Sequence, residues 1–258
     1  VPHLVHVEHN TRERYTRWRL ALARWLARRT DRIVGCSEGV RLRLLELGMP
    51  PARTIAIPNG IRLEPFADAD ASPFDAREPG IIMVARFSAQ KDHATLVRAL
   101  ALLRDRGLRP RLQFAGAGKR GRRENLEALS RELGVEAQVE FPGLVRDVPR
   151  RLMARRICVL STHYEGMPLA LIEGMAAGCA VIGSAVPGVR EVLCDGEDGL
   201  LVPENDAVAM ADALERLLRD GDFAARLGAA ARRAAIERHG RTLMKRRYED
   251  LFVELARR

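Results

Sequence analysis

The sequence has 258 residues, of which 47% are hydrophobic and 30% charged, and its net charge is +9. This composition excludes a disordered chain, and the length fits one large α/β domain or two smaller ones. No apolar run approaches the ~20 residues of a membrane-spanning helix. The segment Val1–Asn10 also lacks the basic and apolar regions of a signal peptide.

The cysteines and the basic residues indicate the cellular compartment and the kinds of partner to expect. The four cysteines show no C-x-x-C spacing, which argues against a zinc site, and Cys158 lies in an apolar run that favours a buried free thiol. We therefore expect a reducing, cytoplasmic setting. Only three of the 43 basic residues are lysine. The arginine excess indicates a solvated surface, with attraction to anionic lipid or an anionic substrate as the alternative. No basic strand interleaved with aromatic residues indicates a nucleic-acid partner.

The first 61 residues alternate between strand and helix patterns. Strand-like runs cover Leu4–Val7, Ile33–Gly35 and Thr54–Ile57. The helix pattern in Thr11–Arg29 has an apolar stripe surrounded by arginines, formed by Tyr15, Trp18, Leu22 and Trp25 or Leu26. We expect this stripe to pack on its own domain. The alternative is peripheral docking at the anionic inner face of a membrane.

Residues 62–79 read as a linker, because they contain three prolines and Asp/Ala pairs without any periodicity. Asp68 and Asp70 form a D-x-D pattern that can hold a divalent metal in other settings. Here the pattern follows no strand, so we read it as part of the linker and expect no metal.

After the linker, strand and helix patterns alternate to residue 238. The strand-like runs are Ile81–Ala85, Leu112–Ala115, Val139–Phe141, Ile157–Leu160, Ala180–Ile182 and Leu200–Val202. Helical spacing of leucines marks Thr95–Leu103 and Leu126–Leu133, and Asp206 is a candidate N-cap for Ala207–Leu218. This density predicts an α/β fold with a doubly wound parallel sheet, Rossmann-like, over residues 80–238. A charged helix follows over 239–258, and 1–61 forms only a partial second α/β domain.

The segment Ser161–Val189 carries the strongest functional signal. Glu165 lies in a loop after a strand, and Glu173 lies in the second turn of a helix that begins near Pro168. A helix N-terminus offers unbonded N–H groups and partial positive charge, which suit a phosphate. Carboxylates beside such a site are suited to accepting hydrogen bonds from sugar hydroxyls. The pattern therefore indicates a nucleotide-sugar.

Arg86 and Lys91 follow the strand Ile81–Ala85 directly and are five residues apart across a turn. Ligands of doubly wound folds bind at the carboxyl ends of strands. Two cations there would stabilise the charge that grows on a departing nucleotide diphosphate. The alternative is a pair of solvated surface cations.

A literal G-x-G-x-x-G spans Gly116–Gly121, with Glu140 about twenty residues later. This is the spacing of a dinucleotide fingerprint, and it keeps an NAD(P)-dependent oxidoreductase open as an alternative. The fingerprint normally follows the first strand of its fold, whereas here it follows the second strand after the linker. We therefore favour a tight turn near a nucleotide.

Taken together, these strings resemble the family 4 (group 1) retaining glycosyltransferases of the GT-B fold. The matching elements, in family order, are Val7–Asn10, Asp31–Glu38, Ile57–Ile61, Arg86 with Lys91, Phe114–Gly118, Phe141–Gly143, and the E-x7-E pair Glu165 and Glu173. The resemblance covers nearly the whole chain. Arg62 stands where the family usually has an aspartate.

The resemblance implies roles for the matching positions. Arg86 and Lys91 would bind the donor diphosphate and Glu165 the donor sugar, as the catalytic set, while Glu173 would bind the ribose. The other donor-binding positions would be Gly116, Gly118, Val145, Gly166, Met167, Leu169 and Ala170. No cofactor beyond the donor substrate is implied. His9 is not assigned as a catalytic base.

The resemblance also implies a chain truncated at its N-terminus: 1–61 a remnant of the acceptor-binding domain, and 80–238 the nucleotide-sugar donor domain. The full enzyme would transfer a hexosyl group to an acceptor hydroxyl with retention. Acceptors across this family include lipid-linked glycans, polysaccharides and small molecules. A non-catalytic nucleotide-sugar-binding module, the oxidoreductase and a nucleotide-sugar epimerase remain the alternatives.

Overall fold

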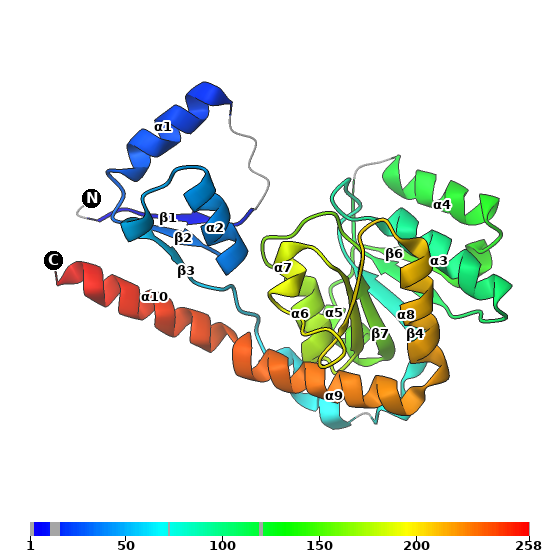
Figure 1. Ribbon diagram of the computed structural model, residues 1–258. Helices are drawn as coiled ribbons and strands as arrows, with labels where there is room; N and C mark the ends of the chain where they lie inside the picture. The colour runs from blue at the N-terminus through cyan, green and yellow to red at the C-terminus, as the bar shows by residue number, and fades with distance from the viewer. Residues whose placement is uncertain (1–2, 11–15, 72, 119–120, 258) are drawn as a thin grey trace.

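The structure is a computed structural model that describes residues 3–10, 16–71, 73–118 and 121–257. Within these residues the strands form two parallel sheets, each covered by helices (Figure 1). We call residues 3–61 the three-stranded unit and residues 78–238 the six-stranded unit. The α/β, doubly wound fold predicted from the sequence is confirmed.

The three-stranded unit contains β1 (Val5–Glu8), β2 (Arg32–Gly35) and β3 (Thr54–Ala56) in that order, with helices α1 (Arg17–Ala27) and α2 (Glu38–Glu46). The strands are in parallel register, with Val7 opposite Val34 and Val34 opposite Ile55. Ser37 caps α2, because its hydroxyl accepts a hydrogen bond from the N–H of Val40 at 3.2 Å.

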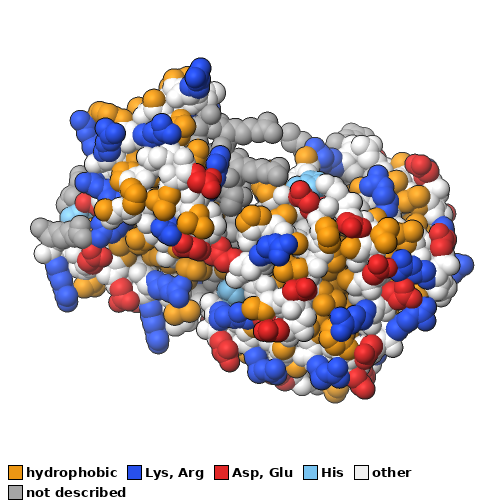
Figure 2. All heavy atoms as spheres, viewed as in Figure 1, with side chains coloured by type: hydrophobic (Ala, Val, Ile, Leu, Met, Phe, Trp, Pro, Cys, Tyr) orange, Lys and Arg blue, Asp and Glu red, His pale blue; other side chains and the backbone are white. Residues whose placement is uncertain are grey.

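Helix α1 presents a different face to its sheet from the one that we expected. The stripe predicted to pack is exposed, with Trp18 64%, Leu22 46%, Trp25 48% and Leu26 46% accessible. The packed side is the narrower row Leu20, Ala23 and Ala27. The prediction of a buried aromatic stripe is therefore wrong: the inward row consists of Leu20 and two small alanines, and the large side chains face outward. Tyr15 lies outside the described residues. Figure 2 shows hydrophobic and basic side chains side by side over this helix.

The segment predicted to be a linker, residues 62–79, contains two short 3₁₀ helices, Glu64–Ala71 and Phe74–Ala76. Phe66 and Ala69 are buried, and Arg232 donates to the Phe66 carbonyl at 3.0 Å. A 3₁₀ helix repeats every three residues, so its buried positions escape a search for the α-helical period. Asp70 forms an ion pair with Arg232 at 2.8 Å.

The six-stranded unit has the strand order β6-β5-β4-β7-β8-β9. The strands are β4 (Glu78–Val84), β5 (Leu112–Ala115), β6 (Val139–Gly143), β7 (Arg155–Leu160), β8 (Ala180–Ser184) and β9 (Leu200–Val202). The helices are α3 (His93–Asp105), α4 (Arg122–Glu132), α5 (Val148–Met153), α6 (Leu169–Ala176), α7 (Pro187–Arg190), α8 (Ala207–Arg219) and α9 (Gly221–Arg238).

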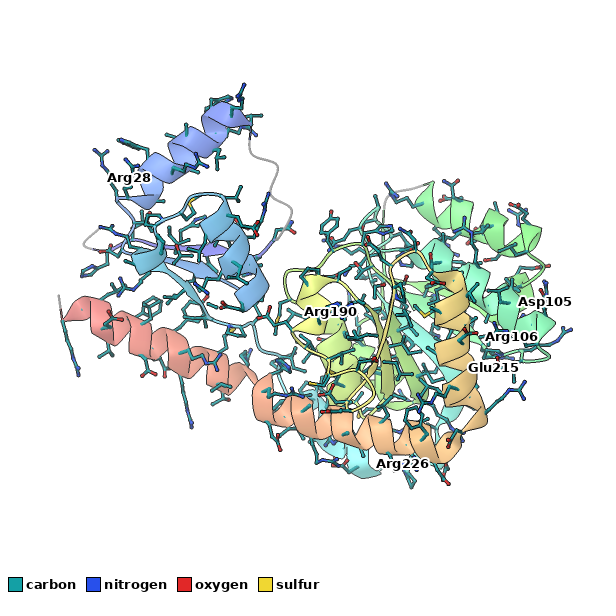
Figure 3. The ribbon with its side chains drawn as sticks, viewed as in Figure 1. Arg28, Asp105, Arg106, Arg190, Glu215 and Arg226 are labelled. Atoms are coloured by element: carbon teal, nitrogen blue, oxygen red, sulfur yellow. The ribbon has the colours of Figure 1, made fainter. Side chains whose placement is uncertain are left out.

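Helices cover both faces of this sheet. Helix α3 packs beside α4 and α8, while α6 packs beside α5 and α9. Arg106 fixes the end of α3 to α8 through Asp212 at 2.7 Å and Glu215 at 2.8 Å, as Figure 3 shows for Arg106 and Glu215. Asp206 caps α8 by accepting from Ala209 N–H at 2.9 Å, which confirms the predicted N-cap.

The last helix, α10 (Arg241–Ala256), runs back to the three-stranded unit (Figure 1). Its Leu251 and Leu255 form a small core with Val34 and Ile57. Where the chain passes between the units, Ile61 N–H donates to His239 O at 2.9 Å and Arg241 N–H donates to Ile61 O at 2.7 Å. No helix in the described residues is long and apolar enough to cross a membrane.

Candidate active site

Four loops follow the carboxyl ends of the neighbouring strands β6, β5, β4 and β7 of the six-stranded sheet. They contain residues 85–92 after β4, 116–118 and 121 after β5, 144–147 after β6 and 161–168 after β7. Parallel sheets of this kind bind ligands in the crevice outside these strand ends. Apart from Glu173, which lies on α6, and Leu169 and Ala170, which begin it, every candidate residue predicted from the sequence lies in these loops.

Lys91 and Glu165 form a direct ion pair between the loops after β4 and β7. Their side chains are only 14% and 8% exposed. Thr162 also donates its hydroxyl proton to Glu165 Oε1, at 2.9 Å. A charge pair this shielded from water needs such additional hydrogen bonds to hold both partners. The sequence predicted both residues of the pair, and the structure places them in contact.

Further hydrogen bonds join the same two loops. The side-chain amide of Gln90 donates to the Tyr164 carbonyl at 2.7 Å, and His163 N–H donates to the Gln90 carbonyl at 2.9 Å. These bonds fix the backbone on either side of the ion pair, so Lys91 and Glu165 sit on a rigid support.

Arg86 lies at the start of the β4 loop and is exposed. Within the described residues its guanidinium makes no ion pair or hydrogen bond, in contrast to Lys91. An arginine in this state retains all five N–H donors for an anion.

Gly116 and Gly118 allow the loops after β4 and β5 to pack backbone to backbone. A Cβ atom at Gly116 would lie 2.0 Å from the Ala85 carbonyl oxygen, and one at Gly118 would lie 2.4 Å from Phe87 Cβ. Gly116 N–H also donates to the Gly143 carbonyl at 2.9 Å, which ties in the loop that carries Val145. Lys119 and Arg120 lie outside the described residues.

The residue that would complete a dinucleotide fingerprint, Glu140, lies near the amino end of β6. It accepts a hydrogen bond from Gln113 at 3.0 Å and pairs with Arg111 and Arg155. Two glycines of the motif are thus explained by close loop packing, and its acidic residue is engaged with Gln113, Arg111 and Arg155.

The loop before α6 presents backbone donors. The N–H groups of Gly166 and Met167 make no hydrogen bond within the described residues. The N–H of Leu169, by contrast, already donates to the Met167 carbonyl at 3.0 Å. Ala170 lies in the first turn of α6, where helical N–H groups lack intrahelical acceptors.

Glu173 is half-buried in α6, and its carboxylate accepts no hydrogen bond within the described residues. Burial raises the pKa of this carboxyl above its ordinary value. An acceptor held in this way can gain from a hydroxyl donor brought by a ligand.

His93, which was not predicted from the sequence as a site residue, supports the loop after β4. It is buried against the rings of Phe87 and Phe114, at centroid distances of 4.9 and 5.1 Å. Its Nδ1–H donates to the Lys91 carbonyl at 2.9 Å. Burial lowers the pKa of His93 to about 4, so the ring is neutral near pH 7.

Sequence reasoning also missed Thr162, Gln90 and Gly188. Gly188 lies on α7 and packs against the Glu165 carbonyl. Thr162 is the second residue after β7 and stands three residues before Glu165, which is a usable signal. Gln90 acts only through backbone partners, which no pattern discloses. Within the described residues, no cluster of three or more histidines, cysteines, aspartates or glutamates is placed to hold a metal.

Comparison with known proteins identifies the family. A family model described as glycosyl transferases group 1 matches residues 66–234, and one described as glycosyltransferase family 4 matches residues 1–65. The putative glycosyltransferase EpsD of Bacillus subtilis (strain 168) is 30% identical over 224 residues, which are 83% of this chain and 58% of that protein. The lipopolysaccharide core biosynthesis glycosyltransferase LpsE of Rhizobium meliloti is 28% identical over 88% of this chain and 65% of its own length. The chain therefore spans less than two thirds of these relatives.

Solved structures share the fold. Sucrose-phosphate synthase from Thermosynechococcus elongatus is 28% identical with a TM-score of 0.83, over 97% of this chain and 67% of that one. Anabaena HepE, crystallised with UDP and glucose, is 20% identical with a TM-score of 0.85, over 97% and 71%. The chain thus belongs to the family 4, group 1 glycosyltransferases and has their GT-B fold.

Proposed function

We propose that this chain binds a nucleotide-diphospho-sugar at the loops after β4 and β7, and that the full enzyme transfers its hexosyl group to an acceptor hydroxyl with retention. The carrying observation is the shielded Lys91–Glu165 pair together with Arg86, which lies in the same loop after β4, is exposed and has no ion-pair or hydrogen-bond partner within the described residues. The UDP bound by HepE supports a nucleotide donor for a chain of the same fold.

In this proposal Arg86 and Lys91 hold the diphosphate. The acceptor hydroxyl oxygen forms a bond to the sugar C1 as the bond from C1 to the phosphate oxygen breaks. The electron pair passes to that phosphate oxygen, both cations stabilise the added charge, and the acceptor's proton passes to the departing diphosphate. Glu165 orients Lys91 and accepts hydrogen bonds from the sugar. The N–H groups of Gly166 and Met167 contact the sugar or phosphate, and Glu173 accepts from the ribose.

The remaining donor-side positions support this arrangement. Gly116 and Gly118 let the loops converge, and Val145 lies in the loop that would border the base. The three-stranded unit would face the acceptor, and the six-stranded unit would hold the donor. We propose that the two cations suffice without a divalent metal; transferase activity that EDTA abolishes would contradict this.

Calorimetric titration with UDP, GDP and ADP tests donor binding. We expect one of the three to bind, and Lys91→Ala to weaken it by about 10- to 100-fold, the worth of one charge-assisted contact. Lys245→Ala is the matched control, because Lys245 is an exposed lysine on α10. Failure of all three nucleotides to bind the unaltered chain would refute the proposal.

Product analysis then separates retention from the alternatives. NMR of the glycosylated product should show the anomeric configuration of the donor. A chain that binds nucleotide but never transfers, even when joined to the remaining length of its relatives, would favour a non-catalytic binding module. Free epimerised nucleotide-sugar would favour an epimerase, and a fluorescence change on mixing with NADH would revive the oxidoreductase.

We also propose that α1 contacts an anionic membrane surface. Its exposed Trp18, Leu22, Trp25 and Leu26 lie among Arg17, Arg19, Arg24, Arg28 and Arg29, all exposed. Aromatic and aliphatic side chains ringed by arginines suit the boundary between headgroups and acyl chains. Vesicles of phosphatidylglycerol should co-sediment with the chain, vesicles of phosphatidylcholine should not, and Trp18→Ser with Trp25→Ser should abolish binding. Equal sedimentation with both vesicles would exclude an electrostatic contact.

A further inference from the structure

Glu191 joins the two units by a contact that neither the fold nor the donor chemistry requires. It directly follows α7 in the six-stranded unit. Its Oε1 accepts a hydrogen bond from Glu38 N–H, and its Oε2 accepts from Gly39 N–H at 2.9 Å. Glu38 and Gly39 are the first residues of α2 in the three-stranded unit. A carboxylate at this position stabilises a helix N-terminus, because it satisfies unbonded N–H groups and opposes their partial positive charge.

Helix α2 receives its N-terminal hydrogen bonds from both units. Ser37 accepts from Val40, while Glu191 accepts from the two preceding N–H groups. If the two units separated, the N–H groups of Glu38 and Gly39 would have only water as a hydrogen-bond acceptor. Glu191 is itself partly solvated, so the contact can break and re-form. Figure 3 labels the adjacent Arg190 on α7, on the side of the six-stranded unit nearest the other unit.

The same helix α7 supports the Glu165 loop. A Cβ atom at Gly188 would lie 2.5 Å from the Glu165 carbonyl oxygen, so α7 packs directly on the backbone of that loop. On its other side, a Cβ atom at Gly166 would lie 2.2 Å from the His9 carbonyl oxygen. The backbone of His9, which directly follows β1, and helix α7 therefore both pack closely on the Glu165–Gly166 backbone.

We propose that Glu191 is a positioning residue: it latches α2 to α7, and thereby holds the end of β1 against the Glu165–Gly166 loop that orients Lys91. This inference rests on the proposed function of that loop. Through this contact the Glu191 carboxylate couples the relative arrangement of the two units to the geometry of the Glu165–Gly166 loop, which would contact the donor sugar. The donor sugar would contact Glu165 and the N–H groups of Gly166 and Met167 in this loop directly, whereas the bare nucleotide depends on the loop only through Lys91. Nucleotide alone should therefore be less sensitive to the latch than the nucleotide-sugar.

Amide hydrogen exchange tests the latch directly. In Glu191→Ala the Glu38 and Gly39 amides should exchange about five- to tenfold faster, as expected on losing a capping carboxylate. Exchange in β7 should stay unchanged, since the latch lies outside the core. Glu191→Gln keeps one acceptor oxygen and should give a smaller effect. Glu191→Asp is too short to reach and should behave like alanine. Glu197→Ala is the control, because Glu197 is an exposed glutamate in the loop that follows α7.

Ligand binding supplies the second readout. Whichever of UDP, GDP and ADP binds the unaltered chain is compared with its glucose or mannose conjugate. We expect Glu191→Ala to raise the Kd of the conjugate at least threefold more than that of the bare nucleotide, and Glu197→Ala to change neither. Equal loss for both ligands, or exchange at Glu38 and Gly39 that matches the unaltered chain, would overturn the latch. If no nucleotide binds, the proposed function fails while the exchange experiment still decides the latch.

Discussion

At the scale of single residues, Glu173 combines a cost in stability with the ribose binding that we propose for it. Its half-buried carboxylate has no partner in the described residues, and burial raises its pKa. Ionisation at neutral pH therefore opposes folding, and this cost disappears as the pH falls through the raised pKa. Glu173→Gln should raise Tm by about 2–4 °C near pH 7, the shift that ~1 kcal/mol gives in a domain of this size, and less near pH 4.

The same variant should weaken nucleotide binding, because a glutamine oxygen is a poorer acceptor for a ribose hydroxyl than a carboxylate. Thermal scans at the two pH values and titration with nucleotide check both effects. Glu132→Gln on α4, an exposed glutamate, is the control and should change neither quantity. A lower Tm for Glu173→Gln at neutral pH would mean that the carboxylate has a stabilising partner.

His93 makes stability depend on pH. Its pKa is about 4 in the folded protein and that of an ordinary histidine when unfolded. Between these values the unfolded chain binds the extra proton, so folding free energy is lost as the pH falls from about 6.5 to about 4, by roughly 3 kcal/mol. Burial likewise lowers the pKa of His239 to about 4, so this residue adds a similar loss.

Urea unfolding across this pH range measures the effect. His93→Gln should flatten the dependence by about half, because His239 continues to titrate. The exposed His6 provides the control variant His6→Gln. A His93→Gln profile parallel to that of the unaltered chain would show that His93 is not buried neutral.

At the scale of elements, the glycines after β5 determine how the site loops meet. Gly116→Ala would place a methyl group 2.0 Å from the Ala85 carbonyl, on backbone that cannot move without separating β4 from β5. We expect a loss of roughly 1–3 kcal/mol of stability. Gly221→Ala is the control, since no atom lies near its Cβ position at the start of α9, and it should be neutral or slightly stabilising. Chemical denaturation compares the two, and equal stabilities would refute the packing role.

How far the elements could be predicted from sequence follows from what sets their ends. The bounds predicted for Leu112–Ala115 match β5, because a run buried on both faces ends where apolar residues end. Strand β4 begins three residues earlier than predicted, at Glu78, which pairs with Arg155 on β7. That extension depends on a partner about 75 residues away, which no local pattern contains.

The candidate site divides in the same way. Lys91 and Glu165 could be predicted because the resemblance to a family fixes both positions, and the structure joins them. Gln90 and Glu191 could not, since each acts through a partner that folding brings near. Thr162 could have been found from its position three residues before Glu165. The outward face of α1 was also mispredicted: periodicity shows that a stripe exists but not which of two stripes meets the sheet.

At the scale of the whole molecule, α10 holds the three-stranded unit in place from the far end of the chain. Leu251 and Leu255 pack on Val34 and Ile57, and Glu254 pairs with Arg32 at 2.5 Å. A sheet of three short strands buries little apolar surface alone, so this small core contributes a large share of its stability. Leu251→Ala should therefore destabilise the three-stranded unit by about 2–4 kcal/mol.

The six-stranded unit should be unaffected, because its core lies elsewhere. Hydrogen exchange measures the stability of each unit separately. In Leu251→Ala the amides of β2 should exchange faster, while those of β7 and β8 keep their protection. Phe252→Ala is the matched control, because Phe252 is next to Leu251 in the sequence and its side chain is 53% exposed. Faster exchange throughout both sheets would mean that the units unfold together. In that case the contacts made by α10, by the Ile61–His239 crossing and by Glu191 would join the two units into one cooperatively unfolding body.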